Sequence, residues 1–285
     1  MSTVESPIST GPAASSRQRA SRTLVWFVER WALFIGCVLV WQLATSAAAN
    51  PYFPTPLNIV RRAGSLWFTG PAGHLWLTDQ VFDDILPSLG RLLLGWGIAS
   101  LVGVAIGLGL GRSPVATDYF GGLLAFARAV PPPTLVPVFL VLFRIGPEME
   151  IATIIFGTVW PVLLNSIDGA RSVDETTMNA VRAFHTPWRR RVFTVILPAA
   201  GPKIFAGLRV SLSIAFILMI ISELVGSTSG IGYQLVFAQG ASDLPGMWSW
   251  IVLVSALGYL CNSLLVAVEH RVLRWHRGAT RRSEG

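Results

Sequence analysis

The stretch Leu92–Gly111 reads LLLGWGIASLVGVAIGLGLG and contains no Asp, Glu, Lys or Arg. A helix needs about 20 apolar residues to cross the hydrocarbon core of a bilayer, so this stretch predicts a membrane-spanning helix. Its small residues recur at every fourth position: Gly95, Ala99, Gly103, Gly107 and Gly111. That spacing places a smooth strip on one helix face, where another backbone packs closely. We expect the strip to serve packing within the chain and not a contact between subunits.

The whole chain has the same character as this stretch. It has 285 residues, of which 52% are hydrophobic and 13% charged, and its mean hydropathy is +0.58. Soluble domains carry about 25% charged residues, so the composition indicates a polytopic membrane protein. We predict an all-α fold of about six transmembrane helices, near residues 31–50, 92–111, 119–143, 151–167, 204–225 and 244–268.

The basic residues are distributed unequally between the two sides of the predicted membrane. One side receives both chain ends and the loop over residues 168–203, whereas the opposite side receives only Arg61, Arg62 and Arg144. The positive-inside rule then places both termini and that loop in the cytoplasm. We expect a disordered cytoplasmic tail over residues 1–22, a transmembrane domain over 23–270 and a basic cytoplasmic tail over 271–285. The net charge of +7 therefore needs no nucleic-acid partner.

The chain lacks the residue patterns of an enzyme. Its only lysine, Lys203, follows Pro202, so a G-x-x-x-x-G-K-[ST] phosphate-binding loop is excluded. No H-E-x-x-H or G-x-S-x-G motif occurs, and Cys37 and Cys261 both fall within predicted spans. We expect no catalytic residue, no metal site and no cofactor in this chain. Any work driven by ATP requires the ATPase of a partner.

A polar, well-punctuated stretch interrupts the apolar chain at residues 172–198, SVDETTMNAVRAFHTPWRRRVFTVILP. Ser172 and Glu175 have the spacing of a capping box, and Thr186 followed by Pro187 is typical of a second helix start. The sequence therefore predicts two short helices, with an apolar stripe formed by Met178, Val181 and Phe184. A helix of this length is only marginally stable alone, so it must pack against a protein or the membrane surface. From these residues alone, the surface that the helix packs against is either the lipid headgroups or a protein partner.

This stretch resembles the EAA loop of the permeases of binding-protein-dependent ABC importers. The pattern of that loop is E-A-A, three residues, Gly, nine residues, an aliphatic residue, then x-Leu-Pro. Aligned through Leu197-Pro198, the aliphatic position is Val195, and E-A-A falls on Asn179-Ala180-Val181. Asn179 replaces the acidic residue and His185 replaces the glycine. The loop is a degenerate copy of the family pattern.

Further motifs are similar to the nitrate, sulfonate and taurine branch of these permeases. These motifs are Ser88–Arg91, Arg128–Pro133, Pro161–Asn165, Gly169–Asp174 and Ser222–Tyr233. Their order and spacing match the family, and together they cover roughly residues 85 to 268.

The resemblance implies the architecture of a type I ABC importer permease in the inner membrane of a bacterial cell. It implies a second permease, identical or different, cytoplasmic ATPases that bind ATP and Mg, and an extracytoplasmic substrate-binding protein. The resembled branch transports small anions such as nitrate, sulfonates and bicarbonate, and also some vitamin precursors, and no residue of this chain selects among them. The loop would act as the coupling helix that docks on the ATPase. The coupling residues would be Met178, Asn179, Ala180, Val181, Phe184, His185, Leu197 and Pro198.

Four residues are candidates for the translocation path: Arg128, Pro131, Pro132 and Glu223. The prolines after Arg128 must break or kink a helix, either to line a cavity or only for packing. Arg128 either attracts an anion or pairs with a nearby acid or the headgroups. Glu223 is either functional at membrane depth or an interfacial carboxylate bonded to the glycine turn that follows.

An ion-coupled secondary transporter is the alternative function. It would need ionisable residues buried near mid-span, or inverted repeats. The sequence shows few mid-span charges and no convincing repeat.

Overall fold

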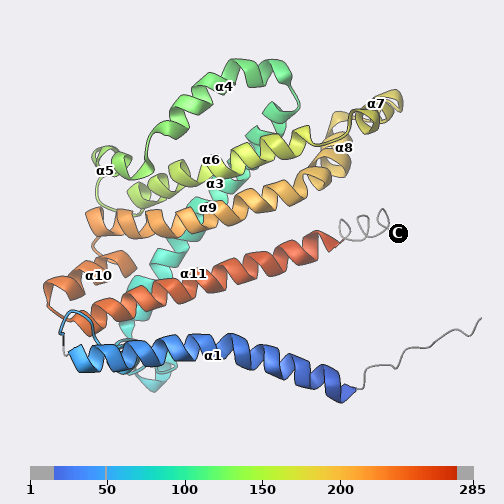
Figure 1. Ribbon diagram of the computed structural model, residues 1–285. Helices are drawn as coiled ribbons and strands as arrows, with labels where there is room; N and C mark the ends of the chain where they lie inside the picture. Colours follow the sequence, from blue (N-terminus) through green and yellow to red (C-terminus); the bar gives the residue numbers. More distant parts are fainter. Residues whose placement is uncertain (1–15, 49, 275–285) are drawn as a thin grey trace, which may run out of the picture. The chain divides into compact units, whose positions relative to one another are not determined.

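The computed structural model describes residues 16–48 and 50–274, and these residues form helices without any strand. Figure 1 shows the arrangement of the helices. The long elements are α1 (Ser16–Ala48), α3 (Leu86–Gly111), α6 (Pro147–Arg171), α9 (Leu197–Gly226) and α11 (Leu244–Val272). The shorter α-helices are α2 (Pro56–Trp67), α4 (Pro114–Ala129), α5 (Val136–Phe143), α7 (Glu175–Ala183), α8 (Trp188–Arg191) and α10 (Ile231–Gly240). Single turns of other helix types are η1 (Ala72–His74), η2 (Val81–Ile85), η3 (Pro132–Leu135) and η4 (Val192–Ile196).

The chain divides into two units, residues 1–60 and residues 61–285. In the first unit, the apolar part of α1, Trp31–Ala48, is long enough to cross a bilayer. The Gln42 side chain accepts a hydrogen bond from the backbone N–H of Leu57 at 3.2 Å, which joins the end of α1 to the start of α2. The predicted tail over residues 1–22 is wrong for residues 16–22, because they belong to α1. Residues 1–15 of that tail lie outside the described residues.

Three packed helices form the core of the second unit: α3 and α6 run parallel, α9 runs antiparallel to them, and α6 packs along both of the others. The small-residue strip of α3 faces α6. A Cβ atom at Gly107 would lie 2.5 Å from Cβ of Ser166, and one at Gly111 would lie 2.6 Å from the Ile167 carbonyl oxygen. Side chains at these positions would force the backbones apart. The prediction that the strip serves packing within the chain is confirmed.

Five described helices are long and apolar enough to span a membrane, and the bent pair α4 and α5 makes a sixth if it crosses as one. The axes of this pair differ by 78°. The bend follows from the proline run, because Pro131 is extended and Pro132 and Pro133 offer no N–H to continue α4. The predicted helix break is confirmed. At the other chain end, α11 runs into the expected basic tail over residues 271–285 as far as Val272, and residues 275–285 are not described.

The starts of α3 and α9 share a local sequence and a local structure. Residues 81–90 read VFDDILPSLG and residues 192–201 read VFTVILPAAG, so the common pattern is V-F-x-x-I-L-P-x-x-G. Each begins with a π-helical turn, in which the N–H of Leu86 bonds to Val81 and the N–H of Leu197 bonds to Val192. The proline that follows each leucine has no N–H, and the wider turn forms just before it. Because α3 and α9 are antiparallel, these two stretches lie at opposite ends of the core (Figure 1).

The polar loop folds into two short helices as predicted, but their first residues differ from the prediction. Asp174, not Ser172, is the N-cap of α7, and its carboxylate accepts the N–H of Thr177 at 3.1 Å. Ser172 is used at the end of α6, where its hydroxyl donates to the Gly169 carbonyl. Likewise Pro187 is the N-cap residue of α8, without a side-chain cap, so Thr186 does not cap it.

Candidate functional site

The loop that carries α7 and α8 lies at one end of α6 and α9, and α10 lies at the other end (Figure 1). We call these the α7 end and the α10 end. The apolar stripe expected on α7 divides into two parts. Met178 is buried against Leu108 of α3, whereas 83% of the Phe184 surface is exposed. Val181 is half-buried between them. One edge of α7 therefore holds the loop on the core, and the other edge, which leads to Phe184, is exposed.

The remaining coupling candidates follow the same division. Asn179 and Ala180 are exposed on α7, so the E-A-A positions are available to a partner. Leu197 and Pro198 are half-buried where η4 passes into α9. His185 has a φ of 50°, in the left-handed region. That conformation favours glycine after a helix end, which is the residue of the family pattern at this position.

A buried ionic cluster lies at the α10 end, and its centre is Arg91 of α3. The guanidinium Nη1 lies 2.5 Å from Oε2 of Glu150 on α6, and Nη2 lies 3.4 Å from Oε1 of Glu223 on α9. The two glutamate side chains are 1% or less exposed and Arg91 is 9% exposed. Charges at this depth are stable only when they are paired and hydrogen-bonded. The cluster therefore fixes the three core helices to one another.

The polar groups of the chain after α9 complete this cluster. Glu223 accepts hydrogen bonds from the Ser88 hydroxyl at 2.5 Å and from the Gly232 N–H at 2.8 Å. Asp84, in the π-helical turn η2, accepts the N–H of Gly230 and the side-chain amide of Gln234, both at 2.7 Å. The loop between α9 and α10 is thus bonded to the start of α3.

Two glycines, Gly230 before α10 and Gly232 in its first turn, are required because the Glu223 side chain packs against them. Gly230 has a φ of 122°, and a Cβ atom there would lie 2.7 Å from the Glu223 carboxyl carbon. A Cβ atom at Gly232 would lie 2.7 Å from the Glu223 Cβ. The glycine-rich composition of this run follows from its packing against the buried carboxylate.

The four path candidates do not come together. Arg128 is exposed in the last turn of α4, and Pro131 is exposed at the bend. Pro132 packs against Gly157 of α6. Glu223 is buried in the ionic cluster and makes the expected hydrogen bond to the glycine turn that follows it. Among the described residues, no three His, Cys, Asp or Glu side chains are grouped as metal ligands.

Residues 99–274, more than half of the chain, match the model of a protein family described as "binding-protein-dependent transport system inner membrane component". The chain belongs to this family. It is a permease of the ABC importer type, a non-catalytic, multi-pass subunit of the inner membrane.

Its curated relatives are transport permeases over nearly their whole length. The aliphatic sulfonates transport permease protein SsuC of Bacillus subtilis is 29% identical over 92% of this chain and 93% of its own. The taurine transport system permease protein TauC of Escherichia coli is 27% identical over 90% and 95%. The bicarbonate transport system permease protein CmpB of Synechococcus elongatus is 27% identical over 84% and 87%.

A solved structure shares the fold. The inward-facing MetNI methionine ABC transporter contains a chain that aligns with a TM-score of 0.57 at 18% identity. The alignment covers 66% of this chain and 94% of the other. The expected all-α permease architecture is confirmed.

Sequence reasoning missed most of the ionic cluster of this permease. The motif Ser88–Arg91 was noted only for its resemblance, and Glu150 lies directly before the predicted start of its span at residue 151. A usable signal was present: Arg91, Glu150 and Glu223 each lie within a few residues of the end of an apolar run. Charges at the same depth in neighbouring helices are expected to pair.

Proposed function

We propose that this permease forms a translocation path for a small anion together with a second permease, identical or different. A separate ATPase docks on the α7–α8 loop and drives transport, and an extracytoplasmic binding protein delivers the solute. ATP and Mg bind to the ATPase, and this chain supplies no cofactor site. The observation that carries the proposal is the division of α7 into a buried edge at Met178 and an edge exposed at Phe184.

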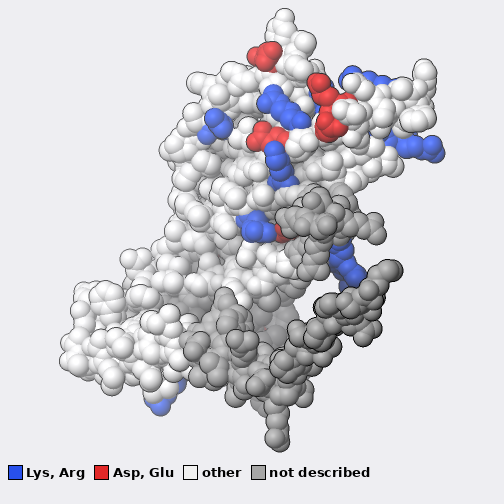
Figure 2. Space-filling model, turned by 45° about the vertical axis from the view of Figure 1, so that its right-hand side comes forward, with Lys and Arg blue, Asp and Glu red and all other residues white. Residues whose placement is uncertain are grey.

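The charge distribution supports a cytoplasmic location for the α7 end. In Figure 2 the Lys and Arg side chains gather mainly over the part of the molecule that carries α7 and α8. The basic residues in or next to this end are Arg112, Arg171, Arg182, Arg189, Arg190, Arg191, Lys203, Arg271 and Arg274. The opposite loops hold Arg61, Arg62 and Arg144. The positive-inside rule then orients the α7 end, the C-terminus and, with six spans, the N-terminus toward the cytoplasm.

The packing of the loop gives a route for mechanical coupling. Met178 shares one buried cluster with Leu108 of α3, Ala170 of α6 and Ala200 of α9. A packed cluster moves as a body, because its side chains have no free space to yield into. Movement of a docked ATPase would therefore displace the ends of all three core helices together. That displacement would switch the translocation path from inward-facing to outward-facing.

The relatives and one exposed arginine support a small anionic solute. SsuC, TauC and CmpB are named for sulfonates, taurine and bicarbonate. In this chain Arg128 is exposed at the bend between α4 and α5 and forms no ion pair within the described residues. We infer that its guanidinium attracts the anion to the path. Uptake assays with labelled sulfonates, nitrate and bicarbonate identify the solute, and Arg128→Gln is expected to raise its KM.

Phe184→Asp tests the coupling assignment. The exposed phenylalanine contributes nothing to the core of this chain, so the variant should reach the membrane at wild-type abundance. It should lose ATP-dependent uptake by tenfold or more, because a charge replaces an apolar anchor in the docking surface. Phe184→Leu, which keeps an apolar side chain, is the matched control and should retain most of the uptake.

Met178→Asp separates docking from folding. Its side chain is 3% exposed, so the carboxylate would be buried in the core cluster and the variant should lose membrane abundance and thermal stability. Normal uptake by Phe184→Asp would exclude the coupling role of this surface. Uptake that persists without ATP and collapses when an ion gradient is removed would instead favour a secondary transporter.

A further inference from the structure

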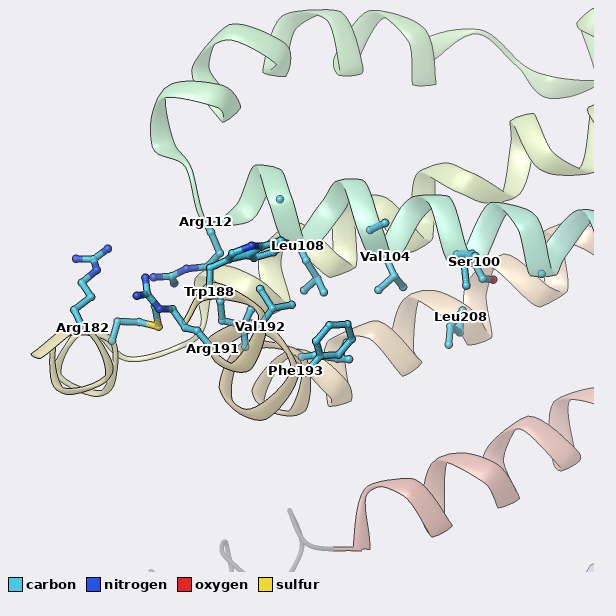
Figure 3. A pocket seen from close by; sticks show the side chains of 17 residues that line it. Ser100, Val104, Leu108, Arg112, Arg182, Trp188, Arg191, Val192, Phe193 and Leu208 are labelled. Carbon is cyan, nitrogen blue, oxygen red and sulfur yellow. The ribbon is translucent and has the colours of Figure 1, made fainter. Parts of the chain in front are cut away.

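A large apolar cavity lies at the α7 end, between the second half of α3 and the α8–η4–α9 segment. Its volume is about 870 Å³, within the range of about 300–1,000 Å³ that is typical of ligand sites. Figure 3 shows Val104 and Leu108 of α3 on one wall and Val192, Phe193 and Leu208 on the other. Phe193 is 66% exposed and Leu101, also in the lining, is 78% exposed. These large apolar surfaces lack a covering partner within residues 61–274.

Three arginines line the same cavity at its α7 end: Arg112, Arg182 and Arg191. None of the 17 lining residues is acidic, and none of the three arginines forms a salt bridge within the described residues. The guanidinium of Arg112 donates to the Ala170 carbonyl, and that of Arg191 donates to the Thr186 carbonyl. The Nε of Arg191 is buried without a hydrogen-bond partner. The mouth of the cavity thus concentrates positive charge that forms no ion pair within residues 61–274.

The positions of these two surfaces match an amphiphile. The apolar walls belong to the transmembrane helices α3 and α9, and the arginines lie where these helices leave the apolar region. Trp188, 69% exposed, lines the boundary between them, as tryptophan does at a membrane interface. A helix from a second protein would cover the apolar walls but would need acidic residues at one defined depth for the arginines. A phospholipid supplies both parts at the required depth.

We propose that this cavity is a binding site for an anionic phospholipid of the leaflet at the α7 end. An acyl chain occupies the apolar part, against Val104, Leu108 and Phe193. The phosphate binds the guanidiniums of Arg112, Arg182 and Arg191 in a charge-assisted manner. With the orientation proposed above, this leaflet is the cytoplasmic one, which is rich in anionic lipids.

The site would connect lipid composition to the coupling loop. Its arginines come from three elements: the end of α3, α7 and α8. One phosphate bound to all three would join the loop to α3 by a contact that adds to the buried Met178. The exposed edge at Phe184 is not among the lining residues, so lipid and ATPase use different faces of the loop.

Native mass spectrometry of the purified permease, with dioleoyl phosphatidylglycerol and dioleoyl phosphatidylcholine added separately in detergent, tests the proposal. We expect one phosphatidylglycerol to be retained in preference to phosphatidylcholine. Arg112→Gln, Arg182→Gln and Arg191→Gln should each lower the retained fraction, by about fivefold per arginine in apparent affinity. The matched control is Arg189→Gln with Arg190→Gln, which removes two neighbouring charges of α8 that do not line the cavity.

A second variant tests the apolar part without changing a charge. Val104→Trp fills the cavity and should reduce phosphatidylglycerol retention as much as the arginine variants do. Unchanged retention in Val104→Trp, or equal loss in the Arg189 and Arg190 control, overturns the proposal. Displacement of the lipid by millimolar glycerol phosphate would show a phosphate site and not a lipid site. Retention of a second permease copy in place of lipid, lost in Val104→Trp, would assign the cavity to a subunit interface.

Discussion

The two ends of the core begin with nearly the same ten residues and become opposite kinds of surface. VFDDILPSLG at residues 81–90 and VFTVILPAAG at 192–201 share six positions, and each forms a π-helical turn before a Leu-Pro helix start. At the α10 end the variable positions include Asp84 and Ser88, and both are buried in the ionic cluster. The corresponding residues at the α7 end are Val195 and Ala199. There the π-helical turn forms a wall of the apolar cavity.

The two stretches therefore have the same backbone conformation but carry side chains of different polarity. The shared residues set the local helix geometry, and at the α10 end two of the substituted positions, Asp84 and Ser88, supply the hydrogen bonds to the neighbouring loop. At the α10 end the chain satisfies its polar groups internally, so the three core helices are held together. At the α7 end apolar and cationic surfaces remain unpaired, which is expected where other molecules bind. One end is closed by this chain, and the other is the end at which we propose that partners bind.

Replacing Arg91, the centre of the ionic cluster, should lower the stability of the folded protein more than any other substitution in these comparisons. Arg91→Met leaves Glu150 and Glu223 buried without their cation, and breaking a buried ion pair on one side costs about 3–5 kcal/mol. We expect the variant to lose most of its folded population in the membrane. Thermal unfolding of the detergent-solubilised protein, followed by size-exclusion chromatography, measures this loss.

Arg128→Met is the matched control for Arg91, because Arg128 is exposed and forms no ion pair in the described structure. Its unfolding temperature should stay close to that of the wild type. Equal stability of the two variants would contradict the view that the α10 end is held by charge.

Exchanging the residues at the eighth position of the V-F-x-x-I-L-P-x-x-G pattern should change the free energy of unfolding by less than Arg91→Met does. The change should be larger at Ser88 than at Ala199. The Ser88 hydroxyl donates to Glu223 and accepts the Ile231 N–H at 3.0 Å. Ser88→Ala leaves that buried N–H unpaired and should cost about 1–3 kcal/mol. The equivalent residue at the other end, Ala199, is exposed, so Ala199→Ser should change stability by less than about 0.5 kcal/mol. The same unfolding assay compares them, and equal effects would remove the distinction between the two ends.

The fold was predictable from the sequence where one element determines its own structure. The charge-free run at Leu92–Gly111 and its glycine strip predicted a spanning helix with a close internal neighbour, and Arg128–Pro133 predicted the helix break. These features depend on hydrophobicity, side-chain volume and the missing proline N–H, all of which are local. The cap at Asp174 was missed because α6 continues to Arg171 and takes Ser172 for its own end. That competition is set by tertiary packing.

The candidate site was less predictable, because it depends on which helices become neighbours. Glu223 was recognised as a candidate by its depth, but its partners Arg91 and Ser88 are more than 130 residues away in the chain. The stripe of α7 was read as one surface. Only the fold shows that Met178 belongs to the core and that Phe184 is exposed. The short repeat was also missed, since ten residues with four differences carry little signal until both are seen to form the same turn.

A half-buried ion pair at the α10 end tests whether full burial, and not charge alone, distinguishes the ionic cluster. Asp243 is the N-cap of α11 and lies 2.5 Å from Arg62, with side chains 26% and 41% exposed. Burial raises the pKa of Asp243, but hydrogen bonds from Arg62 and Gly246 and the charge of Arg62 outweigh it, so the pKa lies below its ordinary value of 3.8. A lowered pKa means that the pair stabilises the folded state above that ordinary value. The stabilisation is lost as the pH falls through the lower, folded-state pKa.

Asp243→Asn should therefore lower the free energy of unfolding less than Arg91→Met or Ser88→Ala does. Asparagine keeps the cap, and a partly exposed pair contributes about 1 kcal/mol or less. The stability difference from the wild type should be constant from about pH 5 to pH 8 and disappear only once the pH is below the lowered folded-state pKa, where the wild-type carboxyl is neutral like the asparagine. Unfolding curves across this range measure it, with Asp118→Asn, an exposed residue of α4, as the control. A loss as large as that of Arg91→Met would mean that charge pairing, irrespective of depth, holds this end of the molecule together.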